Sequence, residues 1–275
     1  MGKLGLRAWI FYSAINILIV ASVWMAADRI GLLWIVPIML SINALLLTYG
    51  QVFQFSHLQA KPFEGIQQLS IYPKIQSLVQ KLDIPMPQFW ILQSPTLQAI
   101  TVGLRPKDTR IYLSHGLINR LAENELLAII TQQLVAAEMH AGIVFYFVAA
   151  VSDLVFRIGA AFDKTLGWIF GIKMQLSTWL TTPVIWLLYK ILIPKNLYSQ
   201  IDQKTLEYIE PPQDLAMALW KMESYAKTLP LVQRQFVLSP ACAVHPLPEY
   251  KPLTWLRTHP PMKSRIKNLV GYFPL

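Results

Sequence analysis

The sequence predicts an α-helical membrane protein that carries a small α+β domain on the cytoplasmic side. The chain has 275 residues, of which 54% are hydrophobic and only 14% are charged, whereas soluble domains have about 25% charged residues. The N-terminal region holds two long runs without a charged residue, 8–27 and 30–49. The polar segments that follow place apolar residues at helix and strand spacing, which predicts a folded domain outside the membrane.

Each of the two N-terminal runs is long enough to cross roughly 30 Å of hydrocarbon as a helix. Asp28 and Arg29 separate them, so we expect a hairpin of two spanning helices with a very short external turn. The first run is too long for a signal peptide, and no small-residue cleavage site follows it. The alternative is a buried helical hairpin of a soluble protein.

Two later apolar runs, 141–158 and 176–193, are weaker candidates because they contain Asp153, Pro183 and Lys190. Proline is tolerated in membrane helices, and a lysine near a helix end can extend to the interface. We expect these runs to form a second hairpin that either crosses the membrane or lies partly in the interface.

Lysine and arginine are concentrated at the N-terminus and in segments 50–140 and 195–275, while the first external turn carries Arg29 alone. Basic segments stay on the cytoplasmic side, so both termini are predicted to be cytoplasmic. This topology accounts for most of the net charge of +9. We expect membrane lipid as a partner, and no nucleic acid, because no basic stripe with interleaved aromatic residues is present. The single cysteine, Cys242, fits a reducing compartment.

The chain is predicted to have four parts. They are an N-terminal transmembrane hairpin (1–50), a cytoplasmic α+β part (51–140), a second apolar hairpin (141–194) and a helical C-terminal part that completes the cytoplasmic domain (195–275). Periodicity within these parts predicts a helix in 66–83 beginning near Pro73, strands within 84–94, 100–103 and 110–118, a helix over 122–141 that continues into the next apolar run, and helices within 197–209 and 214–229.

Four segments together carry a resemblance to a known family. They are SPTLQAITVG (94–103), RIYLSHGLINRLAENELLAII (110–130), ALWKM (218–222) and THPPMKSRI (258–266). In this order they resemble the HtpX family of membrane-embedded zinc metallopeptidases. The resemblance implies a zincin-like metallopeptidase fold and a multi-pass location in a bacterial inner membrane.

The family's metal helix carries H-E-x-x-H, in which two histidines bind Zn²⁺ and the glutamate is the general base. The resemblance places Gln132 at the first histidine, Gln133 at the glutamate and Ala136 at the second histidine. A later family segment, S-R-x-x-E-x-x-A-D, supplies a further glutamate ligand. Matched from Ser199, it places Gln203 at that ligand and Glu207 at the final aspartate.

Glutamine and alanine are poor substitutes for imidazole or carboxylate ligands, and Gln133 cannot accept a proton from water near neutral pH. The resemblance therefore predicts a degenerate site at Gln132, Gln133, Ala136 and Gln203 with no catalytic residue, no bound metal and no cofactor. It predicts a pseudopeptidase that is not an enzyme.

Other residues could in principle rebuild a metal site, and an active metallopeptidase with relocated zinc ligands is the alternative reading. The candidates are Glu138, His140, His115, His259, His57 and His245. For each we expect an ordinary structural role, such as a turn hydrogen bond at His115, an interfacial or capping role at His140 and packing at His259. Cys242 and His245 lie close in sequence, but the loop offers no orienting group for nucleophilic catalysis.

Asp153 raises a third possibility, because an ionisable group in a membrane helix is a candidate for transport. Arg157 lies four residues further on, so a local ion pair also explains both residues. The leading prediction is an inactive protein-binding adaptor or an accessory subunit of a membrane complex. Its expected partners are one or more membrane proteins, and its own expected role is in membrane-protein quality control.

Overall fold

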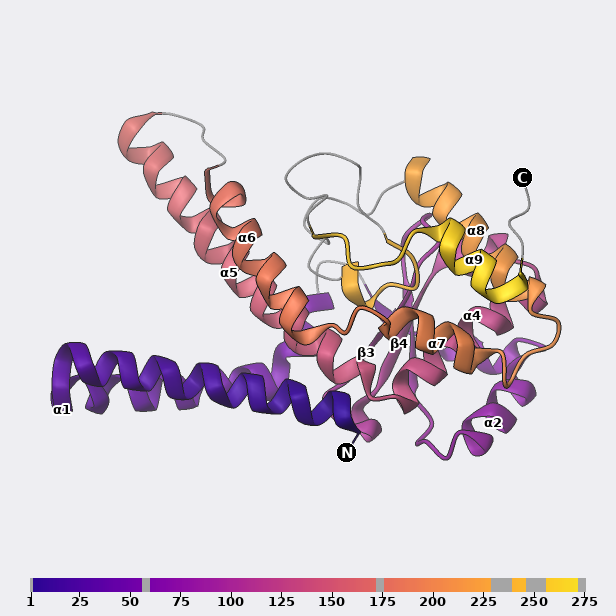
Figure 1. Cartoon of the computed structure of the whole chain (residues 1–275), viewed down its shortest axis with the longest axis horizontal. Helices are drawn as coiled ribbons and strands as arrows, with labels where there is room; N and C mark the ends of the chain where they lie inside the picture. The colour runs from indigo at the N-terminus through magenta and orange to yellow at the C-terminus, as the bar shows by residue number, and fades with distance from the viewer. Residues whose placement is uncertain (1, 56–59, 172–175, 229–238, 246–255, 272–275) are drawn as a thin grey trace.

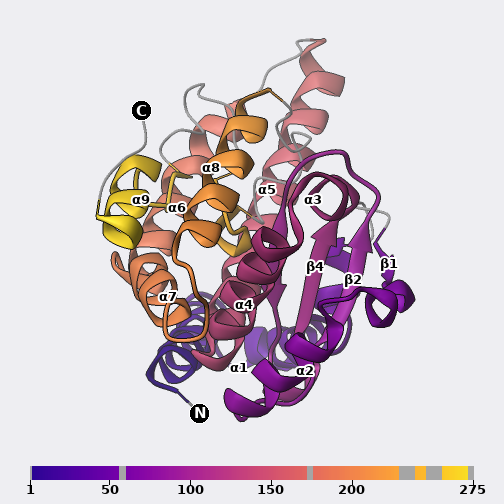
Figure 2. The same ribbon diagram turned by 90° about the vertical axis from the view of Figure 1, so that its right-hand side faces the viewer.

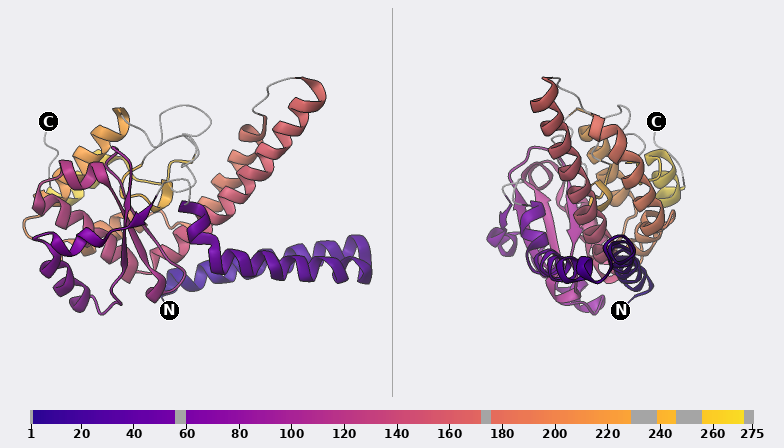
Figure 3. Two further views of the ribbon diagram at one scale, coloured as in Figure 1. Left: turned by 180° about the vertical axis from the view of Figure 1, so that it is seen from behind. Right: turned by 90° about the vertical axis from the view of Figure 1, so that its left-hand side faces the viewer.

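The computed structural model describes residues 2–55, 60–171, 176–228, 239–245 and 256–271. It combines two projecting helical hairpins with an α+β body (Figure 1). Both hairpins leave the same side of the body and diverge from each other, as the view from behind also shows (Figure 3).

The first hairpin is α1 (Lys3–Phe55), which reverses direction at Asp28, where φ is 48° and ψ is −146°. This reversal agrees with the turn predicted at Asp28 and Arg29. Polar side chains join the two halves: the Tyr12 hydroxyl donates to Asn43 Oδ1, and Asn43 Nδ2 donates to Asn16 Oδ1 at 2.8 Å. Interhelical hydrogen bonds of this kind stabilise helix pairs in an apolar solvent.

Among the residues that the structure describes, two helical segments are long and apolar enough to cross a membrane, Leu4–Leu45 in α1 and Ala141–Ile169 in α5. Large apolar side chains along α1 are exposed, which suits a lipid environment. The second hairpin consists of α5 (Ala141–Phe170) and the shorter α6 (Leu176–Leu192). Within α5, Arg157 Nε lies 2.6 Å from Asp153 Oδ2, which confirms the predicted local ion pair.

The body contains a four-stranded sheet in the order β1-β2-β4-β3. Its strands are β1 (Lys61–Pro62), β2 (Gln88–Leu92), β3 (Ala99–Val102) and β4 (Arg110–Ser114). β2 and β4 are parallel, while β1 pairs antiparallel with β2 and β3 antiparallel with β4. β3 therefore lies at an edge of the sheet, although all four of its residues are buried. The 3₁₀ turns η2 (Glu64–Gln68) and η3 (Pro106–Asp108) and the helix α2 (Tyr72–Lys81) complete this part.

The predicted strand over 110–118 is wrong in its second half. β4 ends at Ser114, and α3 (His115–Arg120) begins there. The Ser114 hydroxyl accepts a hydrogen bond from Leu117 N at 3.2 Å, and this N-cap begins a helix. Close packing fixes the same turn, because a Cβ atom on Gly116 would lie 2.1 Å from the Pro95 carbonyl oxygen.

The helix predicted over 122–141 also needs a correction. α4 (Glu123–Glu138) does not run straight into α5, because His140 has a left-handed backbone with φ of 58°. This residue redirects the chain, and α5 starts at Ala141. At the other end of α4, Glu125 Oε2 accepts a hydrogen bond from Ala122 N at 2.9 Å, which caps the helix.

Three further helices complete the body: α7 (Leu197–Thr205), α8 (Gln213–Thr228) and α9 (Met262–Val270). Figure 2 shows α4 between the sheet and the layer formed by α7 and α8. Lys221 of α8 reaches back to Glu125 of α4, with Nζ 2.7 Å from Oε1. α4 is thus the central helix of the body and contacts segments from both sides of the second hairpin.

Candidate functional site

The middle of α4 presents Gln132, Gln133 and Ala136 to the interior. Their exposed fractions are 2%, 4% and 3%. Gln132 and Ala136 are four residues apart, so they lie on one face of the helix. The three residues that the sequence placed at the positions of the metal motif are therefore together and buried.

A continuous chain of hydrogen bonds satisfies the two glutamines. The Thr101 hydroxyl donates to Gln133 Oε1 at 2.8 Å, Gln133 Nε2 donates to Gln132 Oε1 at 3.2 Å, and Gln132 Nε2 donates to Asp202 Oδ1 at 2.5 Å. A carboxylate only accepts hydrogen bonds, so Asp202 fixes the orientation of both amides. The chain connects strand β3, helix α4 and helix α7.

Asp202 also forms a buried ion pair with Arg265 of α9. Arg265 Nε lies 2.7 Å from Oδ2 and Nη2 lies 2.8 Å from Oδ1, which is a bidentate arrangement. The two side chains are only 4% and 2% exposed. Burial alone would lower the pKa of Arg265, but the Asp202 carboxylate more than offsets this and raises it. The guanidinium is therefore the cation that balances Asp202.

The structure does not bring Gln203 to this cluster, so the predicted place of Gln203 at the site is wrong. Gln203 and Glu207 are exposed. The buried face of α7 consists of Leu197, Tyr198, Ile201, Asp202 and Thr205. The family segment S-R-x-x-E-x-x-A-D separates its glutamate and aspartate by four residues; matching its aspartate to Asp202 places Tyr198 at the ligand position.

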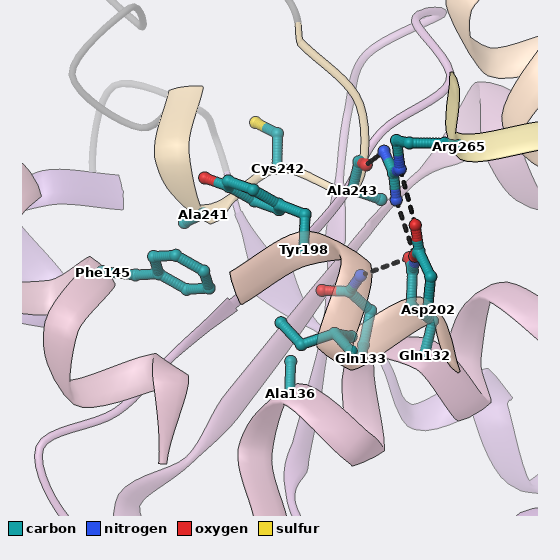
Figure 4. A pocket seen from close by; sticks show the side chains of 11 residues that line it. Gln132, Gln133, Ala136, Phe145, Tyr198, Asp202, Ala241, Cys242, Ala243 and Arg265 are labelled. Carbon is teal, nitrogen blue, oxygen red and sulfur yellow. Dashed lines mark hydrogen bonds and ion pairs between the residues drawn. The ribbon is translucent and has the colours of Figure 1, made fainter. Parts of the chain in front are cut away.

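A small pocket of about 20 Å³, enough for about one water molecule, lies at the centre of this cluster (Figure 4). α4 contributes Gln132, Gln133 and Ala136 to its walls, and α7 contributes Tyr198, Ile201 and Asp202. The remaining lining residues are Phe145 of α5, Arg265 of α9 and the segment Ala241, Cys242 and Ala243. Tyr198, Asp202 and Arg265 were not predicted from the sequence as members of the site. The spacing of apolar residues on α7 was the signal that could have identified Tyr198 and Asp202.

The donor set of this pocket does not fit the zinc ion of the family. Zinc sites in proteins use imidazole, thiolate or carboxylate ligands. Here the amide of Gln132 donates to Asp202, Ala136 has no donor atom, and both oxygens of Asp202 are bound by Arg265. Within the described residues, no group of three His, Cys, Asp or Glu side chains is close enough to hold a metal ion. The cluster can bind and orient polar groups, but we derive no metal-dependent step from it.

The histidines have separate positions. His259 is buried, stacks on Tyr198 with ring centroids 4.1 Å apart, and has Nε2 2.8 Å from the Cys242 carbonyl oxygen, in agreement with the predicted packing role. His245 packs edge-on against His259 at 5.8 Å. His115 is exposed and bonds Asn119. Nδ1 of His140 lies 2.8 Å from the Glu138 carbonyl oxygen. His57 lies outside the described residues.

Acid should destabilise the fold through His245. Burial, followed by the charge of Arg257, lowers the pKa of His245 to about 4 from its usual 6.5. The folded imidazole stays neutral while the unfolded one takes up a proton. The contribution of His245 to the free energy of unfolding is therefore fully present above the pKa of the unfolded state, and it is lost as the pH falls from there toward the pKa of the folded state.

We expect His245→Gln to flatten the loss of thermal stability between these two pKa values. His115→Gln, at an exposed histidine, should leave the slope unchanged, and equal slopes in both variants would refute this assignment.

Known proteins of one peptidase family are similar to this chain. The family model described as Peptidase family M48 matches residues 66–132. A "Protease HtpX homolog" of Pelotomaculum thermopropionicum is 23% identical over 274 residues, covering 96% of this chain and 97% of that protein. Another from Desulfatibacillum aliphaticivorans is 24% identical and covers 90% of this chain and 82% of its own length. These matches support the M48 peptidase family for this chain.

The fold comparison agrees with an M48 assignment. The crystal structure of Ste24p from S. mikatae superposes with a TM-score of 0.50 at 14% identity, covering 96% of this chain and 67% of that one. At this identity the likeness concerns the fold, and it supports a membrane metallopeptidase fold. The predicted zincin-like class with apolar helices and a small sheet is consistent with it.

The prediction that the chain is not an enzyme is wrong. The M48 model, the HtpX relatives and the Ste24p neighbour all point to a protease family. The prediction took the residues at one set of motif positions as evidence about the activity of the whole chain. Gln132, Gln133 and Ala136 are evidence about those three positions only. Nothing shows that this M48-like chain is inactive.

Proposed function

We propose that this chain is a membrane-anchored polypeptide-binding protein of the M48 peptidase type. In this proposal the surface around the small pocket beside α4 binds segments of other membrane proteins, and the chain acts as an adaptor or accessory subunit in membrane-protein quality control. The proposed location is a bacterial inner membrane with both termini in the cytoplasm. The lysine and arginine distribution and the bacterial HtpX relatives support this location.

The observation that carries the proposal is the position of Phe145. This residue belongs to the first turns of α5, a candidate membrane helix, yet it lines the same pocket as Gln132 of α4. The pocket therefore lies beside the first turns of α5, and Figure 1 shows that this helix projects from the body. A polypeptide that leaves the bilayer beside α5 would reach this pocket first.

The proposal is tested by photocrosslinking in native membranes. A photoreactive phenylalanine analogue in place of Phe145 puts the probe in the wall of the pocket. We expect this position to crosslink to membrane proteins in discrete bands. Because the reaction requires close contact, the bands should weaken when purified polypeptide competes for the pocket.

The matched control carries the same analogue at Lys74, an exposed position on α2. We expect few or no bands from it. Equal crosslinking from the two positions, or no crosslinks at Phe145, would show that the pocket is not where polypeptide binds, and the proposal would then be abandoned.

A further inference from the structure

The segment Ser239–Val244, here called the strap, lies against the outer edge of β3. Ala243 N donates to the Ala99 carbonyl oxygen at 2.9 Å, and Cys242 pairs with Ile100 in an antiparallel bridge. The opposite side of β3 pairs with β4. The strap thus takes the position that an added strand would occupy at this edge of the sheet.

Three further side chains are hydrogen-bonded to the main chain of the strap. The Tyr198 hydroxyl lies 2.8 Å from the Pro240 carbonyl oxygen and His259 Nε2 lies 2.8 Å from that of Cys242. Arg265 Nη1 donates to the Ala243 carbonyl oxygen, also at 2.8 Å. All three groups are directed at main-chain carbonyls, which any amino-acid sequence offers.

The strap presents only small side chains to the pocket. Ala241, Cys242 and Ala243 are 3%, 2% and 4% exposed and form one wall of the pocket beside α4. Figure 4 shows this wall facing Tyr198 and Arg265. A groove that grips the backbone and leaves little space for side chains selects polypeptide segments rich in small residues.

We infer that the strap is an internal occupant of a polypeptide-binding groove, and that a partner segment with small side chains binds there by displacing it. This inference rests on the proposed function, because it names the chemistry of the polypeptide held beside α4. The attachment suits exchange: β4 pairs with β3 at four positions, whereas the strap forms a single bridge. The strap would therefore open at a lower cost than the sheet.

Cys242 provides a direct reporter of strap opening. It is the only cysteine in the chain and is almost fully buried in the strap. Burial raises the pKa of the Cys242 thiol, so the closed strap should react slowly with a maleimide. The full chain in lipid nanodiscs is labelled with and without the peptide Ser-Pro-Ala-Ser-Ala-Val, which copies the strap with serine in place of the cysteine. We expect the peptide to accelerate labelling in a saturable manner.

Two variants each remove one hydrogen bond that holds the strap. Ala243→Pro removes the N–H that bonds Ala99, and Tyr198→Phe removes the hydroxyl that bonds Pro240 while keeping the ring. Loss of one such hydrogen bond should accelerate labelling about fivefold in either variant. Ala243→Pro should also tighten peptide binding by a similar factor, whereas Tyr198→Phe should not, because the bound peptide loses the same hydrogen bond as the strap. Tyr208→Phe removes a hydroxyl outside the groove and should change neither value. The conservative Tyr198→Phe keeps the test valid if the proline variant fails to fold.

Unchanged labelling in the presence of peptide, together with equal labelling rates in the wild type and both variants, overturns the inference. The photocrosslinking at Phe145 separates this failure from failure of the proposed function. Crosslinks without any response of the strap leave the proposed function in place and remove the inference. Peptide-dependent labelling without crosslinks supports the strap and overturns the proposed function.

Discussion

Arg265→Ala should lower the free energy of unfolding by about 3–5 kcal/mol, because it leaves the buried Asp202 carboxylate without its cation. The same substitution removes the donor to the Ala243 carbonyl oxygen, so the strap should loosen as well. Thermal unfolding of the full chain in detergent, followed by circular dichroism, measures the loss. Arg265→Lys should recover part of it, because an ammonium keeps the charge but cannot make the bidentate contact.

Lys267→Ala provides the matched control, since Lys267 lies exposed on the same helix α9. Its effect should stay within about 0.5 kcal/mol. The double variant Asp202→Leu with Arg265→Met removes both charges together and should be more stable than Arg265→Ala alone. If Arg265→Ala unfolded at the temperature of Lys267→Ala, the pair would not be the organising contact that its burial indicates.

The second large effect is a gain of zinc binding. The triple variant Gln132→His, Ala136→His and Tyr198→Glu places two imidazoles and a carboxylate around the pocket, a set that catalytic zinc sites use. We expect about one zinc ion per chain in this variant after dialysis against trace zinc. Tyr198→Glu also removes the contacts to Pro240 and His259, so the metal-free variant should be less stable than the metal-bound one.

The control differs only in its third position. The variant Gln132→His, Ala136→His and Gln203→Glu places the carboxylate on the exposed face of α7, and it should bind zinc more weakly. Elemental analysis of the two proteins, prepared in parallel, decides between Tyr198 and Gln203 as the residue that faces the pair on α4. Equal or tighter zinc binding by the Gln203 variant would restore the correspondence that the structure rejects.

Features that depend only on residues close together in the sequence were predictable. The two apolar runs around Asp28 and Arg29 specify the α1 hairpin by length and composition alone. The spacing of apolar residues on α4 buries Gln132, Gln133 and Ala136 together, as the resemblance implied. The ion pair between Asp153 and Arg157 followed from a separation of four residues on one helix.

Features that depend on distant parts of the chain were not predictable. Asp202 is 63 positions from Arg265 and 70 from Gln132, so no local pattern signals their contact. The match from Ser199 ignored the buried face of α7 and chose Gln203, which lies five residues after Tyr198 and on the exposed face of the helix. The breaks at Ser114 and His140 depend on a cap and on a left-handed residue, which apolar periodicity does not detect.

The most direct test of the central claim, that the pair Asp202 and Arg265 organises the pocket in place of a metal ion, is the zinc content of the wild-type chain. The full-length protein is purified from membranes without chelators and analysed for metal, and its unfolding temperature is measured before and after chelator treatment. We predict far less than one zinc per chain and an unfolding temperature that the chelator leaves unchanged. One zinc per chain, whose removal lowers the unfolding temperature, would contradict the claim.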